Sequence, residues 1–167
     1  MTVSNTATVK VAVKSTMVNS GTLSTATAPL DFSASYTLAN GTAADQANHF
    51  FAATYTGVDS TGNSHDLAGG LTDAFGSTTT FTAIKTLVVK AASTNSGNVI
   101  VGGAASNAFA SMFGDATDKV ALKPGGILVL HDPSAAGYAV TAGTGDLLKI
   151  AASSGTVDYD LVLIGEA

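Results

Sequence analysis

The sequence predicts an all-β protein whose main part is a β-sandwich, jelly roll or barrel, and the form we expect is a jelly-roll-like, two-sheet β-sandwich of about eight to ten strands. Short runs rich in apolar and β-branched residues recur at intervals of roughly 8–12 residues, the spacing typical of such folds. Turn-forming Gly, Pro, Asn and Asp residues separate these runs. The sequence has no repeat of fixed period, which disfavours a solenoid or a propeller.

The first 32 residues predict an extended N-terminal strand and arm. Thr8–Lys14 alternates valine with lysine and alanine, the pattern of a half-buried strand. Residues 15–32 are rich in Ser, Thr and Ala and contain Pro29, which indicates an extended or loop-like segment. We therefore divide the chain into an arm, residues 1–32, and a β-sandwich domain, residues 33–167.

The first part of the domain mixes strand and turn signals. Ser33–Leu38 and the aromatic- and threonine-rich His49–Thr56 are predicted strands. Asn40-Gly41 and residues 59–63 are predicted turns. The remaining predictions are one helical turn at Ala44–Asn48 and a short helix or irregular loop at Leu67–Phe75.

Strand signals become dense after Thr78. The predicted strands are residues 80–90, 98–101, 119–122, 127–131, 138–141, 147–151 and 156–164. A second helical turn is predicted at Ser106–Phe113, where Phe109, Met112 and Phe113 have near-helical spacing.

Two of these strands contain a stretch that is apolar at every position. The stretches are residues 127–130 (ILVL) and 161–164 (LVLI). A sandwich core covers only one face of a strand, so the other face is expected to pack on a second subunit. Apolar strands left uncovered at an edge would promote aggregation.

The composition also favours burial against partners. Charged residues make up 11% of the chain, against about 25% in average proteins. Ala, Gly, Ser and Thr replace them, and small side chains lose little entropy when they are buried at a contact. This surface suits an assembling subunit, although it also fits an ordinary extracellular β domain.

Several partner classes are not expected. The formal net charge is −5 and the chain has no arginine, which disfavours phosphate binding and bidentate base readout in nucleic acids. The N-terminus lacks the basic and apolar regions of a secretory signal, and no apolar run approaches the ~20 residues of a membrane helix. The absence of cysteine excludes disulfides and thiolate metal ligands.

Two adjacent histidine–acid pairs, His65-Asp66 and His131-Asp132, are candidate metal ligands if the fold brings them together. Nothing in their spacing requires this. Asp132 precedes Pro133, where an aspartate commonly caps a turn, and the turn interpretation is favoured.

Asp158 and Asp160 are candidate Ca²⁺ ligands because residues two apart on a strand share a face. Asp146 or Asp132 would complete such a site. The favoured alternative is a solvated strand face, with Val157, Tyr159 and Leu161 directed toward the core.

We expect no enzymatic activity and no cofactor. A glycoside hydrolase needs a carboxyl pair in a cleft, usually with aromatic sugar platforms. The chain has no tryptophan, and its single glutamate, Glu166, lies beside the chain end. It also contains no G-x-S-x-G elbow, P-loop or dinucleotide-binding glycine motif.

Four segments carry a resemblance to a known group of proteins. They are residues 66–91 (DLAGGLTDAFGSTTTFTAIKTLVVKA), 98–114 (NVIVGGAASNAFASMFG), 119–155 (beginning KVALKPGGILVLHDP) and 156–165 (TVDYDLVLIG). This part of the chain resembles small virion structural proteins of tailed phages, such as head-decoration and minor virion proteins. The resemblance implies a jelly-roll-like sandwich in symmetric contact with a capsid or tail, and it implies no active site.

From these observations we expect a capsid decoration or cement protein on the virion surface, made in the cytoplasm of a bacterial host. The expected partners are copies of itself, with a trimer favoured, and the major capsid protein or another virion protein. Residues 1–30 are the candidate segment for ordering on a neighbour. Two alternatives stay open: a tail- or fibre-associated module that binds host glycans, and a bacterial surface domain, which the lack of a signal disfavours.

Overall fold

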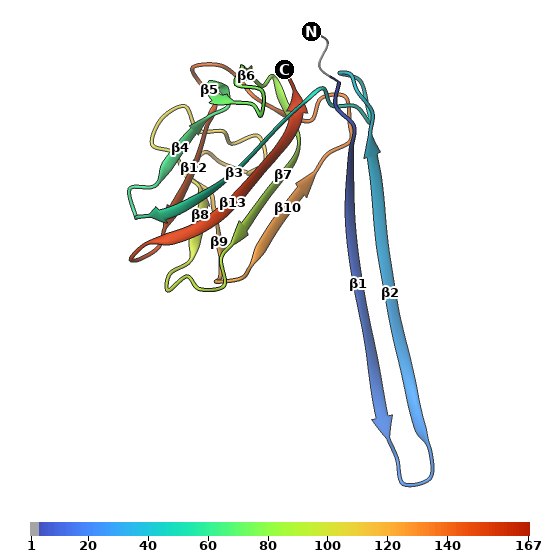
Figure 1. The fold of residues 1–167 in the computed structure, drawn as a ribbon. Helices are drawn as coiled ribbons and strands as arrows, with labels where there is room; N and C mark the ends of the chain where they lie inside the picture. The colour runs from blue at the N-terminus through green and yellow to red at the C-terminus, as the bar shows by residue number, and fades with distance from the viewer. Residues whose placement is uncertain (1–3) are drawn as a thin grey trace.

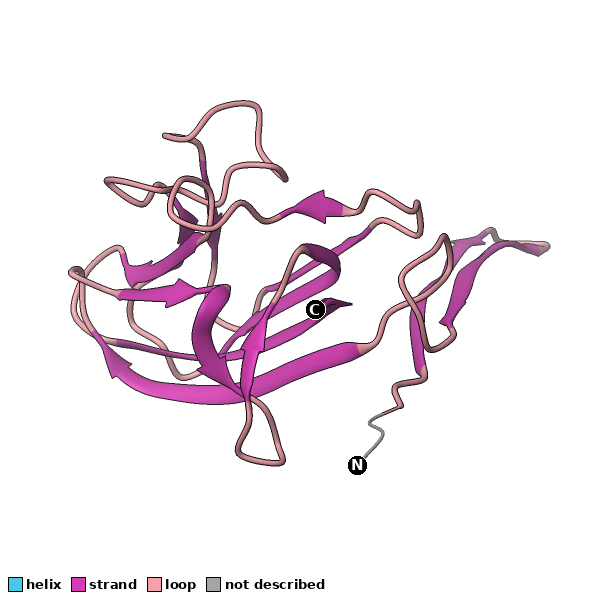
Figure 2. Ribbon diagram, turned by 90° about the horizontal axis from the view of Figure 1, so that it is seen from above, coloured by secondary structure: helices cyan, strands magenta, loops and turns pink. Residues whose placement is uncertain are grey.

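The computed structural model describes residues 4–167, and all regular secondary structure in this range is β-strand (Figures 1 and 2). The strands are β1 (Ala7–Ser20), β2 (Thr25–Leu38), β3 (His49–Val58), β4 (Asn63–Asp66), β5 (Ala68–Thr72), β6 (Thr78–Thr80), β7 (Ala83–Ala91), β8 (Val99–Gly102), β9 (Lys119–Leu122), β10 (Ile127–His131), β11 (Tyr138–Ala139), β12 (Leu147–Ala152) and β13 (Val157–Glu166). The predicted all-β class is confirmed. Within the described range no helix is long and apolar enough to cross a membrane.

Two antiparallel sheets make up most of the body. The first has the strand order β10-β7-β13-β3, and the short β11 also pairs with β7. The second has the order β4-β12-β8-β9, while β5 and β6 form a small separate ladder. Figure 1 shows the first sheet in front of the second, and their inward side chains share one hydrophobic core.

Alternation along the strands builds this core. In β13, Leu161 and Leu163 are fully buried, whereas Val162 and Ile164, which alternate with them, are half-buried. Leu148 and Ile150 of β12 are fully buried from the opposite sheet. Burying each such side chain stabilises the fold by about 1.5–3 kcal/mol. The inward-facing side chains, at every second position of the strands, therefore hold the two sheets together.

The strands β1 and β2 form a hairpin that projects from the body (Figure 1). They pair along their whole length, from Ala7 opposite Leu38 to Ser20 opposite Thr25. At ~3.3 Å per residue, a strand of 14 residues is roughly 46 Å long. Most of the hairpin therefore lies far from the hydrophobic core.

The base of the hairpin is fixed to the body. Leu38 and Ala47 are fully buried there, and the Ala47 amide donates to the Ala39 carbonyl at 2.9 Å. The Asp45 amide donates to the carbonyl of Pro133, just beyond β10, at 2.8 Å. The side chain of Asn48 exchanges two hydrogen bonds of 2.9 Å with the backbone of Ala167, which joins the hairpin base to the chain end.

The two predicted helical turns are wrong. Residues 44–48 and 106–113 contain turns and isolated bridges instead. Asp45 and Asn107 have φ angles of 57° and 50°, a left-handed conformation that cannot continue a right-handed helix. Asn107 also accepts backbone hydrogen bonds from Asp146 and Leu147, so tertiary pairing replaces the local helical turn.

Two segments with weak strand signals also contain strands. Residues 15–32, predicted to be extended or loop-like, form the outer part of the hairpin, so the hairpin crosses the predicted boundary at residue 32. Both strands of a lone hairpin are edge strands, where a proline such as Pro29 is tolerated. Residues 67–75, predicted as a short helix or loop, contain β5, which pairs with β6.

Candidate interaction surface

One face of the hairpin is almost entirely apolar, and we call it the apolar hairpin face. The register of β1 and β2 places alternate residues of both strands on the same side. This side carries Ala7, Val9, Val11, Val13, Ser15, Met17 and Asn19 of β1, with Ala26, Ala28, Leu30, Phe32, Ala34, Tyr36 and Leu38 of β2. Only Ser15 and Asn19 interrupt it. Val9 and Leu38 are buried at the base, and all the large apolar side chains beyond them are exposed.

The opposite face of the hairpin is polar. It holds every charged residue of the two strands, namely Lys10, Lys14 and Asp31. Lys14 Nζ and Asp31 Oδ2 lie 3.0 Å apart in an exposed ion pair. The hairpin is thus an amphipathic ribbon. Its alternation of apolar and polar residues is typical of antiparallel strands that have one face buried.

Two strands alone rarely form a stable structure in water. Here Met17 is 76% exposed, and Phe32 is 53% exposed. Large contiguous apolar patches on soluble proteins usually mark interaction sites. The apolar hairpin face is therefore the strongest candidate functional surface of the described chain.

The outer face of the first sheet, which we call the outer sheet face, carries an apolar row beside the Lys90–Asp160 ion pair. Cross-strand pairing aligns Val129, Val88, Val162 and Ala52 in one row across β10, β7, β13 and β3. Val129 is 36% exposed, and Ile127, in the next row, is 59% exposed. The apolar strand at residues 127–130 thus has only its inner side directed to the core of its own chain.

The apolar hairpin face and the outer sheet face meet at the hairpin base. The rings of Tyr36 and His131 have centroids 4.7 Å apart, and His131 Nδ1 lies 3.0 Å from the hydroxyl of Thr86. Thr86 is only 1% exposed, although it belongs to the outer sheet face. Burial lowers the pKa of His131. The hairpin base therefore covers one end of this sheet face and leaves the rest open.

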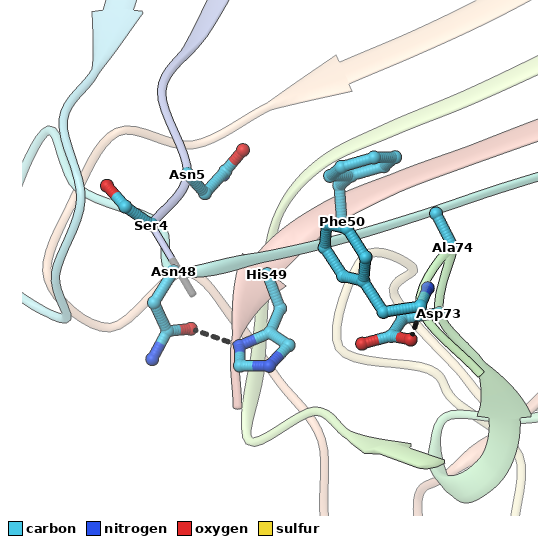
Figure 3. Close-up of a pocket in the computed structure, with 8 residues that line it drawn as sticks. Ser4, Asn5, Asn48, His49, Phe50, Asp73 and Ala74 are labelled. Carbon is cyan, nitrogen blue, oxygen red and sulfur yellow. Dashed lines mark hydrogen bonds between the residues drawn. The ribbon is translucent and has the colours of Figure 1, made fainter. Parts of the chain in front are cut away.

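A small cavity of about 70 Å³ lies beside the hairpin base (Figure 3). It is lined by Ser4, Asn5, Asn48, His49, Phe50 and residues 73–75. Drug-sized ligands need cavities of roughly 300–1,000 Å³, so this one is too small for them. The rings of Phe50 and Phe75, which are 43% and 71% exposed, extend the apolar surface at this end instead.

A buried ion pair supports the same region from inside. Lys85 is fully buried, and its Nζ lies 2.7 Å from Glu166 Oε1. The ammonium also donates to the carbonyls of Ser134 and Ala135. It thereby fixes the loop that carries Pro133, the hydrogen-bond acceptor of the hairpin base.

A second polar cluster lies between the sheets. The Tyr159 hydroxyl lies 2.9 Å from His65 Nε2 and accepts a bond of 3.1 Å from Asn63 Nδ2. The Tyr55 ring stacks on Tyr159 with centroids 5.1 Å apart. Burial lowers the pKa of His65 to about 4 and raises that of Tyr159 to about 12, so both side chains are neutral at pH 7. No carboxylate or nucleophile completes this cluster into a familiar catalytic arrangement among the described residues.

The fold keeps the two histidine–acid pairs apart. His65 contacts Tyr55 and Tyr159 between the sheets, whereas His131 contacts Thr86 and Tyr36 on the outer sheet face. The aspartate of each pair instead accepts a hydrogen bond from a nearby backbone amide. Asp66 Oδ1 accepts from the Ala68 amide and Asp132 Oδ1 from the Ser134 amide, and the latter bond lowers the pKa of Asp132.

Asp158 and Asp160 point outward from β13, while Val157, Tyr159 and Leu161 are buried, as their alternation predicts. Asp158 Oδ1 accepts from the Gly57 amide at 2.7 Å, and Asp160 Oδ1 accepts from the Thr54 hydroxyl at 2.7 Å. Asp146 accepts from the Gly143 amide near the start of β12. Within residues 4–167 no three His, Asp or Glu side chains gather in a group that could hold a metal ion.

Comparison with known proteins identifies no relative. No protein-family profile, no curated protein and no solved structure matches the chain.

Proposed function

We propose that this protein is a non-enzymatic structural component of a tailed-phage particle, most specifically a decoration or cement protein of the capsid. It would stabilise the head by burying its apolar surfaces between subunits. Its partners would be copies of itself, with a trimer favoured, and the major capsid protein or another virion protein. Its place would be the capsid surface, after synthesis in the host bacterial cytoplasm.

The exposed apolar hairpin face carries this proposal. The ribbon is roughly 46 Å long and has an apolar side and a charged side, and beyond its buried base it has no role in the core of its own chain. It has the form expected of an arm that attaches to a neighbouring subunit. Many weak contacts repeated over a symmetric particle would then act together.

The strand order supports a jelly-roll-like sandwich as the fold of the body. Lettering β3, β4, β7, β8, β9, β10, β12 and β13 from B to I gives one sheet with the order B-I-D-G and a second with C-H-E-F. These two orders are the ones expected for a jelly roll, a fold found in viral capsid proteins and also in lectins. A shared fold does not establish a shared function, so the hairpin remains the main support.

The test is to locate the protein on particles. Phage particles from a lysate of the host bacterium would be purified on a density gradient and labelled with gold-conjugated antibody to this chain. We expect label on the head surface, in electron micrographs and in proportion to the capsid protein in peptide mass spectra. Particles free of the protein would overturn the proposal.

The second candidate is a tail- or fibre-associated module that binds host-surface glycans. Tyr55, Asp59 and Asn63 line a shallow hollow of about 450 Å³ at one end of the body, where an aromatic ring, a carboxylate and an amide lie together. Such a mixture of groups suits sugar recognition. Label confined to tails, together with binding to a glycan array, would favour this candidate over the capsid role.

A further inference from the structure

The apolar hairpin face and the outer sheet face are two uncovered apolar surfaces of one chain. We infer that they bind each other between copies: the hairpin of one chain packs on the outer sheet face of a second copy of this chain. The inference rests on the proposed structural role and names the partner in that role. Each copy both gives a hairpin and receives one, so the assembly closes by exchange.

The charges of the two surfaces favour this pairing. Lys10, Lys14 and Asp31 all lie on the polar face of the hairpin, so the apolar hairpin face brings no charge into the contact. On the outer sheet face, Lys90 and Asp160 neutralise each other at 3.8 Å, and Asp160 also accepts from Thr54. The row of Val129, Val88, Val162 and Ala52 beside this pair is uncharged, and two uncharged surfaces can be desolvated together at little cost.

The contact at the hairpin base shows the two surfaces already packed together in one chain. Tyr36 belongs to the apolar hairpin face and His131 to the outer sheet face, and their rings are 4.7 Å apart. Beyond this point the hairpin leads away from its own sheet, and Val13, Met17 and Phe32 are exposed. The rest of the sheet face is thus open to a hairpin that arrives from elsewhere.

The dimensions are compatible with a stable contact. Packed β layers lie about 10 Å apart, and β7 offers a run of 9 residues, roughly 30 Å, for the hairpin to follow. Each copy takes part in two such contacts, one through its hairpin and one through its outer sheet face, and together these bury on the order of 1,200 Å², the lower end of the range for specific interfaces. A single contact would fall short, which favours a closed assembly, such as the proposed trimer, in which every copy makes both contacts.

Cross-linking tests the pairing directly, because the natural chain has no cysteine. A tagged Val13→Cys chain and an untagged Val129→Cys chain would be co-expressed and treated with a bis-maleimide of about 10 Å reach, the separation of packed sheets. We expect a cross-linked product that contains one chain of each kind. The matched control is Ala12→Cys, on the polar face next to Val13, which should lose this product.

Solution mass provides the second measurement. Light scattering of the full chain over a wide concentration range should give a closed oligomer, and Phe32→Asp or Val129→Asp should convert it to a monomer. Ser33→Asp, next to Phe32 but on the polar face, should keep the oligomer. All three residues lie outside the core cluster, and circular dichroism would verify that each variant is folded.

A monomeric natural chain, or equal cross-linking from Ala12→Cys and Val13→Cys, would overturn the inference. These outcomes are separable from the particle test. A monomer found on phage heads would leave the proposed function standing with another partner for the hairpin. A closed oligomer absent from particles would support the exchange and overturn the virion role.

Discussion

His65 lies between the two sheets, where its Nε2 is 2.9 Å from the Tyr159 hydroxyl. The Asn63 amide already donates to that hydroxyl, so the hydroxyl is placed to donate its own proton to His65. This arrangement requires an unprotonated Nε2. A proton there would force the Tyr159 hydroxyl to act as acceptor instead of donor and would place a charge in a side chain that is only 5% exposed.

Stability should therefore fall at acidic pH in a defined window. The pKa of His65 is about 4 in the folded protein, against 6.5 for a histidine in an unfolded chain. Between these pH values the unfolded state binds more protons, so the free energy of unfolding decreases as pH falls from 6.5 through 4. The full effect is about 3 kcal/mol, and urea unfolding at pH 7 and pH 4 measures it.

His65→Gln provides the comparison for this prediction. Its side chain can still accept a hydrogen bond from Tyr159 but does not titrate, so the loss of stability between pH 7 and pH 4 should shrink by about 3 kcal/mol. His131, Asp115 and Asp132 also have lowered pKa values and keep a residual acid sensitivity in both proteins. An unchanged loss in the variant would show that His65 does not carry the effect.

For single residues, the sequence predicted which side chains face the core wherever the alternation along one strand decides this. Tyr159 was expected in the core and Asp158 and Asp160 outside it, and their places confirm this. The hydrogen bond to His65 could not be predicted, because it joins residues 94 positions apart. The strand that carries His65 is only 4 residues long, too short for a clear period.

Among the strands, β13 is paired on both sides, with β3 and with β7. Its register with β7 shifts between Ile164 and Gly165, which marks a bulge or irregularity. A side chain at Gly165 would collide with the Ala83 carbonyl oxygen and lie 3.1 Å from Ile84 Cα. The absence of a side chain at this position thus permits close contact with β7.

Gly165→Ala should destabilise the protein by roughly 1–3 kcal/mol, because the added methyl group meets backbone rather than a movable side chain. The denaturant midpoint in urea measures the change. Gly145→Ala is the matched control, since a Cβ there meets its nearest neighbour, Thr141 Cβ, at an ordinary 3.7 Å. Equal effects of the two substitutions would contradict the role given to the β13–β7 contact.

Element prediction succeeded where strands are bounded by strong turn signals. Residues 119–122 and 127–131 are strands with the predicted bounds, because Pro124-Gly125-Gly126 separates them clearly. It was less specific where pairing rather than composition decides. The Ser/Thr/Ala-rich residues 15–32 have little intrinsic signal and were predicted only as extended or loop-like; their two halves form strands by pairing with each other.

For the whole molecule, the β-rich class follows from the spacing of strands, but the arrangement of sheets does not. Neighbours such as β13 and β3 lie far apart in the chain, and the alternation of apolar and polar residues within a strand does not determine which strand it pairs with. The sequence indicated an N-terminal arm and an uncovered strand at residues 127–130. It could not indicate that the apolar hairpin face and the outer sheet face meet at Tyr36 and His131, because this contact depends on how the hairpin leaves the body.

The structure separates the hairpin from the folding unit, and this leads to a prediction for the molecule as a whole. Among the described residues, the core cluster draws its members from Phe51 onward. Replacing residues 10–35 by Asn-Gly would join Val9 to Tyr36, which face each other across the ribbon, through a two-residue turn. The buried base, with Val9 and Leu38, would be kept.

The shortened chain should fold with nearly the same unfolding transition in urea, since its core is complete. It should also lose self-association in light scattering, and with it the proposed attachment to phage heads, because the apolar hairpin face is gone. Val9→Asp in the full-length chain is the contrasting variant: it places a charge at a position that is 8% exposed and should reduce stability. A shortened chain that is unfolded would show that the hairpin belongs to the folding unit and would contradict the prediction of a separate docking arm.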